Sequence, residues 1–183
     1  MIELNTPLTK EKIKQLKVGD QVLLSGVIYT GRDAAHKRLI ELIQNNQPLP
    51  FELNDQVIYY VGPTPEKENG VFGSGGPTTS GRMDAYAPIL IGLGLRSMIG
   101  KGYRNDQVKE SIKLHTGVYF GAIGGAGAYI GECVKSSKII AFEDLGAEAI
   151  RQLTVEKMPL TVVIDCLGND LYQIGPQQYL NTF

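Results

Sequence analysis

The stretch VGDQVLLSGVIYTGRDAAHKRLIELIQNN, residues 18–46, changes its hydrophobic pattern at one glycine, and this change indicates the fold. Up to Gly31 the residues are rich in Val, Leu and Ile, which is typical of a strand. After Gly31 the apolar residues recur at the spacing i, i+4, i+7 and i+8, one face of a helix, as Ala35, Leu39, Leu42 and Ile43. The stretch therefore predicts a strand, a glycine turn and a helix.

The same alternation of strand and helix patterns continues along the chain. We expect further strands at 57–63, 96–102, 117–124 and 138–144. We expect helices at 7–16, with Thr9 as N-cap, and at 80–93, 105–114 and within 124–134. Two more strand patterns end the chain, at 153–157 and 160–174, with a hairpin turn at Gly168-Asn169. Alternating strands and helices indicate an α/β fold, and the hairpin argues against an entirely parallel sheet.

Length and composition limit the class of protein. A chain of 183 residues suits a single domain, 1–183, with a real hydrophobic core. Hydrophobic residues make up 43% and charged residues 20%, which argues against disorder. The longest apolar run, 87–95, is far shorter than the roughly 20 residues of a membrane helix. Lys plus Arg (18) nearly balances Asp plus Glu (19), so we expect neither nucleic acid nor a membrane surface as partner.

The two cysteines and the N-terminus indicate a cytoplasmic protein. Cys133 and Cys166 form neither a CxxC pair nor a disulfide framework, and MIELNTPLTKEKIKQL is too polar for a signal peptide. Together with the distant His36 and His115, the cysteines lack metal-ligand spacing, so we expect no metal site on this chain. His36 fits a packing role better than a ligand role.

The segment GSGGPTTSGRMD, residues 73–84, has the form of an anion-binding loop. A glycine-rich loop that enters a helix presents free backbone N–H groups, here around Gly76 and Thr79, at the positive end of the helix dipole. Arg82 would lie in the first helical turn, where a cation is unfavourable unless an anion is also bound. An ordinary capped loop, with Arg82 paired to Asp84 or another acid, is the alternative.

Two more cations occupy similar positions. Arg32 follows a strand-ending glycine and opens a helix, as Arg82 does, and guanidinium groups form bidentate pairs with carboxylates. Two such arginines suggest a ligand with two carboxylates. Lys101 stands between two glycines after a short strand, which allows an exposed ammonium, although an ordinary turn lysine is commoner. Asp33 fits the role of an acid in the first helical turn, where it stabilises the helix dipole, and we assign it no other role.

The glycine-rich run GAIGGAGA, residues 121–128, resembles tight packing between a strand and a helix. Its glycines at 125, 127 and 131 depart from the GxGxxG spacing of a dinucleotide site. No Ser-His-Asp or Cys-His arrangement stands out either.

Four motifs in order, TGRDAAHKR, GPTTSGRMDAYAP, GKG and YFGAIGGAGA, resemble the β subunit of class I iron-sulfur fumarases and L-tartrate dehydratases. This subunit is equivalent to the C-terminal domain of the single-chain enzymes, and the resemblance covers roughly residues 5–175. It implies a swivelling β/β/α domain with a mixed sheet flanked by helices. It also implies an α subunit as partner, with a 4Fe–4S cluster bound by that α subunit rather than by this chain.

The resemblance further implies roles for individual residues. Thr78 matches the catalytic base of the family, whereas Arg32, Arg82 and Lys101 match residues that bind the substrate carboxylates. The implied reaction interconverts (S)-malate with fumarate and water, and this chain alone would be inactive. A threonine hydroxyl is a poor base by itself, so Thr78 as a mere helix cap is the alternative reading.

Two other functions stay open. L-Tartrate differs from malate by one hydroxyl, and nothing in the motifs separates an L-tartrate dehydratase β subunit from a fumarase β subunit. A non-catalytic dicarboxylate-binding module with the same fold would bind its ligand without an α subunit.

Overall fold

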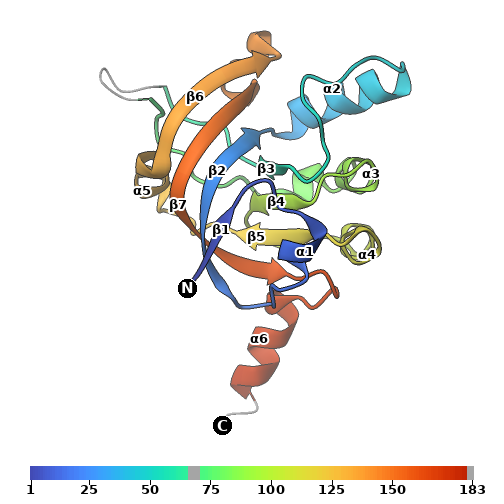
Figure 1. Ribbon diagram of the computed structural model, residues 1–183, viewed down its shortest axis with the longest axis vertical. Helices are drawn as coiled ribbons and strands as arrows, with labels where there is room; N and C mark the ends of the chain where they lie inside the picture. The colour runs from blue at the N-terminus through green and yellow to red at the C-terminus, as the bar shows by residue number, and fades with distance from the viewer. Residues whose placement is uncertain (66–70, 181–183) are drawn as a thin grey trace.

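The computed structural model describes residues 1–65 and 71–180, which contain seven strands in one mixed sheet (Figure 1). The strands are β1 (Ile2–Asn5), β2 (Gln21–Thr30), β3 (Val57–Tyr59), β4 (Ser97–Gly100), β5 (Val118–Gly121), β6 (Val134–Ala141) and β7 (Ile150–Ile164). The helices are α1 (Lys10–Ile13), α2 (Asp33–Gln44), α3 (Ala87–Gly92), α4 (Asp106–His115), α5 (Gly127–Cys133) and α6 (Leu171–Leu180). Two short 3₁₀ turns, η1 (Ser80–Met83) and η2 (Glu143–Glu148), complete the elements.

The long strand β7 closes most of the sheet into a ring. Strands β1 to β5 pair in parallel in sequence order, whereas β7 runs antiparallel to β2, β5 and β6. One end of β7 pairs with β5, at Ile164 opposite Tyr119, and its middle pairs with β2, at Met158 opposite Leu24. The ring therefore runs β2-β3-β4-β5-β7 and back to β2. The predicted mixed sheet flanked by helices is confirmed.

Alternation along the strands divides the core into two layers. Successive strand residues point to opposite faces, so Val57 and Tyr59 pack inside the ring while Ile58 packs outside it. The outer layer is covered by α2, α3 and α4, which lie together on one side in Figure 1. On α4, the predicted face of Val108 and Ile112 is fully buried. Burial of both faces explains why β3 and β5 are almost uniformly apolar.

The single helix predicted over 80–93 is wrong. The structure has the 3₁₀ turn η1 followed, after a break at 84–86, by the separate helix α3. Pro88 explains the break, because a proline ring inside a continuous helix collides with the carbonyl four residues earlier, here that of Asp84. Pro88 instead stands in the first turn of α3, where its missing N–H costs nothing.

The prediction of a terminal hairpin at Gly168-Asn169 is also wrong, because the turn is followed by helix α6 instead of a strand. Asp170 provides the helix start: its carboxylate accepts a hydrogen bond from the Tyr172 N–H at 3.0 Å, as an N-cap does. In Figure 1, α6 projects away from the ring. The sheet is nevertheless mixed, because β7 itself runs antiparallel to its neighbours.

Smaller differences concern strand limits and one cap. Strand β1 has no predicted counterpart, β6 begins four residues earlier than expected, and the patterns at 153–157 and 160–164 belong to the single strand β7. Thr9 stands at the N-cap position of α1, but its side chain makes no capping hydrogen bond. No helix among the described residues has the length and apolar character needed to cross a membrane.

Candidate functional site

The predicted site residues lie at the carboxyl ends of the parallel strands. Arg32 follows β2, Lys101 follows β4, and the segment after β3 returns to the sheet at Thr78, whose N–H donates to the Tyr60 carbonyl at 2.7 Å. Carboxyl ends of parallel strands share one edge of the sheet, which is where open α/β sheets bind ligands. The topology therefore gathers motifs that are up to about 70 residues apart.

Arg32 is held by acids of its own chain. Its guanidinium lies 3.2 Å from the Glu148 carboxylate, and the other oxygen of Glu148 accepts the Ala34 N–H at 3.2 Å. The Nε of Arg32 is 3.9 Å from Asp33 Oδ1, and both atoms are buried without a hydrogen-bond partner among the described residues. Arg32 thus retains an unused donor beside an unused acceptor, which is costly unless water or a ligand joins them.

Asp33 joins the two predicted arginines. Its Oδ2 accepts a hydrogen bond from Arg82 Nη2 at 2.8 Å, while its Oδ1 faces Arg32. The side chain of Arg82 is 49% exposed, so one side of the guanidinium remains open. The structure therefore places a carboxylate between Arg32 and Arg82, in the arrangement that the sequence suggested for a ligand. Asp84 or another acid was expected as an ion-pair partner of Arg82, and the structure shows Asp33 in this place.

Asp84 pairs instead with Arg104, which the sequence analysis did not consider. Arg104 Nε donates to Asp84 Oδ1 at 2.6 Å, and the Asn105 N–H donates to the second oxygen at 2.6 Å. The guanidinium of Arg104 also lies 5.3 Å and 5.1 Å from the ring centroids of Tyr60 and Tyr119. No sequence signal distinguished Arg104 from an ordinary surface arginine, because its burial arises only when β4, β5 and the 3₁₀ turn come together.

The helix-dipole argument for the loop at 73–84 is wrong, because η1 has only four residues and most loop amides are already bonded. The N–H groups of Gly75, Thr78 and Ser80 donate to the carbonyls of Gly127, Tyr60 and Lys101. The cap reading of Thr78 also fails, because the N-cap position of η1 is Thr79, which makes no side-chain cap bond. The hydroxyl of half-buried Thr78 has no hydrogen-bond partner in the described part of the chain.

Lys101 lies beside this loop. Its backbone forms a parallel bridge with Thr79, and both side chains are exposed. The Lys101 ammonium forms no ion pair with any described residue. Gly76 is exposed, and a Cβ atom there would meet no atom within 4 Å, so the space beside the loop is open. The binding roles of Arg32, Arg82, Lys101, Gly76 and Thr79 and the catalytic role of Thr78 remain predictions.

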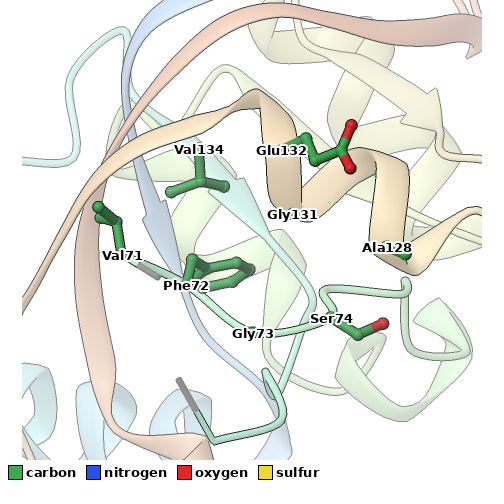
Figure 2. A pocket seen from close by; sticks show the side chains of 8 residues that line it. All are labelled: Val71, Phe72, Gly73, Ser74, Ala128, Gly131, Glu132 and Val134. Carbon is green, nitrogen blue, oxygen red and sulfur yellow. The ribbon is translucent and has the colours of Figure 1, made fainter. Parts of the chain in front are cut away.

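The glycines of helix α5 pack against this loop. A Cβ atom on Gly131 would lie 2.6 Å from the Gly73 carbonyl oxygen, and one on Gly127 would lie 2.5 Å from Ser74 Oγ. Figure 2 shows this contact between α5 and the loop, around a cavity of about 230 Å³. Among the described residues that line this cavity, Glu132 is the charged one. An acidic lining does not suit a dicarboxylate, so the glycines serve close packing, here between helix and loop.

His36 lies beneath the arginines as a neutral, buried residue. Its Nδ1 is 2.8 Å from the Arg32 carbonyl, so this nitrogen carries the proton, and its ring packs edge-on against Tyr60. Burial is the main cause that lowers the pKa of His36 from 6.5 to about 4, opposed by the bond to the Arg32 carbonyl. The predicted packing role fits this environment, and His36 fixes the backbone at the start of α2.

The described residues do not fit a 4Fe–4S cluster. They contain no group of three or more His, Cys, Asp or Glu residues that could hold a metal ion. Cys133 ends α5 and is buried, whereas Cys166 lies two residues after the end of β7 at Ile164. Burial raises the pKa of both thiols, which disfavours the thiolate form that metals bind.

Comparison with known proteins assigns nearly the whole chain to one family. The family model described as "Fumarase C-terminus" matches residues 1–175. A fumarate hydratase 2 from Leishmania major is 38% identical over 175 residues, and a class I aerobic fumarate hydratase from Escherichia coli K12 is 39% identical over 176 residues. These alignments cover 93% and 94% of this chain but 31% and 32% of the relatives. The chain thus spans about a third of the length of these fumarate hydratases.

A relative of similar length carries a different name. A Methanocaldococcus jannaschii protein named as a candidate L(+)-tartrate dehydratase subunit beta is 40% identical over 172 residues. The alignment covers 91% of this chain and 88% of that protein.

Proposed function

The chain belongs to the Fumarase C-terminus family, and on this basis we propose that it is the β subunit of a two-chain hydro-lyase. The proposed reaction interconverts (S)-malate with fumarate and water. The observation that carries the proposal is the meeting of Arg32 and Arg82 around one carboxylate at the carboxyl edge of the parallel strands. The enzyme names of the relatives supply the reaction class, which the fold alone does not.

The charges of the site support binding of a carboxylate but are not sufficient for a dianion. Arg32, Arg82 and Lys101 carry three positive charges, and Asp33 and Glu148 carry two negative ones. The remaining net charge of +1 only half neutralises a dicarboxylate. We therefore assign the missing recognition groups to an α subunit that completes the site above the exposed faces of Arg82 and Lys101.

Removal of a proton from the carbon beside a carboxylate spreads negative charge onto that carboxylate. Fixed cations placed where this charge develops stabilise the transition state more than the ground state. Arg82 and Lys101 are assigned this role, and Arg32 is assigned the binding of the second carboxylate. Because Glu148 holds Arg32 in place, its guanidinium is preorganised for this contact.

Thr78 is assigned the role of the base. Its hydroxyl has no hydrogen-bond partner among the described residues, and it lies next to Thr79, which pairs with Lys101. An ammonium brought beside this hydroxyl would favour its alkoxide form, although a threonine still needs a group that accepts its proton. We assign that acceptor, like the 4Fe–4S cluster, to the α subunit, because the described residues offer no ligand set.

The experiment that tests this function is an anaerobic assay of the chain alone and of the chain mixed with a cluster-reconstituted candidate α subunit. Dehydration of malate and of L-tartrate is followed in parallel. Turnover in the mixture alone is the expected result, and malate is the expected substrate. Faster turnover of L-tartrate would support the second candidate, which the Methanocaldococcus jannaschii relative favours by its name and matching length. A stable complex without turnover of either substrate would favour a dicarboxylate-binding module.

Substitution of Thr78 by alanine tests the proposed base in the same assembly. We expect turnover to fall by at least about 10²-fold, the lower range for a proton-transfer group, with an unchanged melting temperature. Thr9→Ala is the matched control, because Thr9 is also a half-buried threonine and is not among the predicted site residues. Retained turnover in Thr78→Ala would refute the assignment.

A further inference from the structure

The backbone of Lys101 and Gly102 is bonded at every polar atom. The Lys101 N–H donates to Ser80 Oγ at 3.1 Å, and its carbonyl accepts the Ser80 N–H at 2.9 Å. The Gly102 carbonyl accepts the Tyr119 hydroxyl at 3.0 Å, and its N–H donates to the Tyr172 hydroxyl at 3.3 Å. The partners come from η1, β5 and α6, so three separate elements converge on one dipeptide.

The direction of these hydrogen bonds can be assigned. A carbonyl only accepts, so the Tyr119 proton points to Gly102, and the Ser80 hydroxyl, 2.8 Å from Tyr119 Oη, must donate to it. The result is a series of hydrogen bonds that runs from the Lys101 N–H through Ser80 and Tyr119 back to the Gly102 carbonyl. Burial raises the pKa of Tyr119, so its hydroxyl keeps the proton that this series requires. Consecutive hydrogen bonds in a poorly solvated site strengthen one another.

Close packing around these hydrogen bonds restricts the positions of Ser80 and of the Lys101–Gly102 backbone. A Cβ atom on Gly100 would lie 2.0 Å from Ser80 Oγ, so only glycine at this end of β4 lets Ser80 approach Lys101. Gly102 has φ of +82°, which glycine adopts without strain. The Arg104 guanidinium, itself fixed by Asp84, covers the Tyr119 ring at 5.1 Å.

The side chain of Lys101 has no comparable support. It is exposed, and its ammonium has no ion-pair partner among the described residues. The ammonium stands on a flexible four-carbon stem, so the backbone from which it extends defines the region beside Arg82 and Thr78 that it can reach. A shift of that backbone would shift this whole region.

We propose that Ser80, Tyr119 and Tyr172 are positioning residues that fix the Lys101–Gly102 backbone and thereby the location of the Lys101 ammonium in the substrate site. The backbone part of this proposal stands on the hydrogen bonds alone. The substrate part rests on the function proposed above. Sub-ångström placement of a charged group matters for rate, since a displacement of about 1 Å can cost on the order of 10²-fold.

Amide hydrogen exchange in the isolated chain tests the backbone part without any activity. In Ser80→Ala and Tyr119→Phe we expect exchange at residues 100–103 to become faster, by up to about tenfold for one lost hydrogen bond. Tyr29→Phe is the matched control, because it removes a half-buried hydroxyl bonded to Gln152 rather than to this dipeptide. Unchanged exchange in both test variants would overturn the proposed scaffold.

Kinetics of the assembled enzyme test the substrate part. We expect kcat/KM to fall about tenfold in Tyr119→Phe and by a smaller factor in Tyr172→Phe. In the control Tyr29→Phe we expect kcat/KM to stay unchanged. Lys101→Ala combined with Tyr119→Phe should be no worse than Lys101→Ala alone, because the scaffold acts through Lys101. Faster exchange with unchanged kcat/KM, or full additivity in the double variant, would overturn the proposal. A wild-type assembly without turnover would count against the proposed function alone, because the exchange measurement judges the scaffold separately.

Discussion

Arg82 and Asp84 are two residues apart, but they belong to different ion pairs in different environments. The Arg104–Asp84 pair is joined at 2.6 Å with side chains 0% and 10% exposed. The Arg82–Asp33 pair is joined at 2.8 Å with side chains 49% and 32% exposed. The first pair lies in the protein interior, whereas the second faces solvent at the edge that carries the predicted site.

The difference in environment gives the two pairs different roles. The buried pair is saturated, since Asp84 also accepts the Asn105 N–H and Arg104 lies over two tyrosine rings. Removing one partner would strand a charge in the interior. The exposed pair contributes little to stability and leaves part of the Arg82 guanidinium open, as the proposed binding of a substrate carboxylate requires. Burial, rather than residue type, separates the structural arginine, Arg104, from Arg82, the arginine proposed to bind substrate.

The largest expected effect is the loss of the buried pair. Asp84→Ala should lower the free energy of unfolding by about 3–5 kcal/mol, because Arg104 is left charged and unpaired in the interior. Urea unfolding of the isolated chain measures this change. Asp33→Ala is the matched control and should cost less than about 1 kcal/mol. Equal losses of unfolding free energy in Asp84→Ala and Asp33→Ala would show that the buried and the exposed ion pair do not differ in their contribution to stability.

Next in size is the loss of the exposed arginine. Arg82→Ala should lower turnover of the assembled enzyme by about 10²–10³-fold, because a charge stabiliser of the transition state is removed. The free energy of unfolding should change by less than about 1 kcal/mol, as for other exposed pairs. Parallel kinetics and urea unfolding check both halves of this prediction. Near-wild-type turnover would show that Arg82 does not contact the substrate.

A third prediction concerns the buried His36, whose pKa is lowered by burial to about 4. Its pKa in the unfolded chain is near 6.5, so the unfolded state binds the proton more tightly. The free energy of unfolding is therefore highest above pH 6.5, where His36 is neutral in both states. It falls by about 3 kcal/mol as the pH drops from 6.5 to 4. His36→Gln should show a correspondingly flatter profile of unfolding free energy between pH 7 and pH 4. Parallel profiles for variant and wild type would contradict this assignment.

Local pattern was sufficient for several elements and for picking out two arginines that the structure brings to one carboxylate. The strand, glycine turn and helix around Gly31 are found as predicted, because period 2 and period 3.6 patterns are properties of neighbouring residues. Arg32 and Arg82 were selected from their places after glycines, and the structure brings both to Asp33.

The failures share a physical cause. The helix over 80–93 and the terminal hairpin were misassigned where one residue, Pro88 or Asp170, overrides the pattern of its neighbours. Arg104 and Tyr119 were missed because their roles depend on contacts between β4, β5 and η1, which are distant in sequence.

By itself, the sequence determined the alternation of strands and helices and the family resemblance, and it singled out candidate cations, because these depend on residue types and short spacings. Only the tertiary structure decided that β7 closes the ring, that Asp33 rather than Asp84 faces Arg82, and that three hydroxyl groups bond the Lys101–Gly102 backbone. Such contacts join residues far apart in the chain. Their formation depends on the burial and geometry of the whole sheet, which no short stretch of sequence contains.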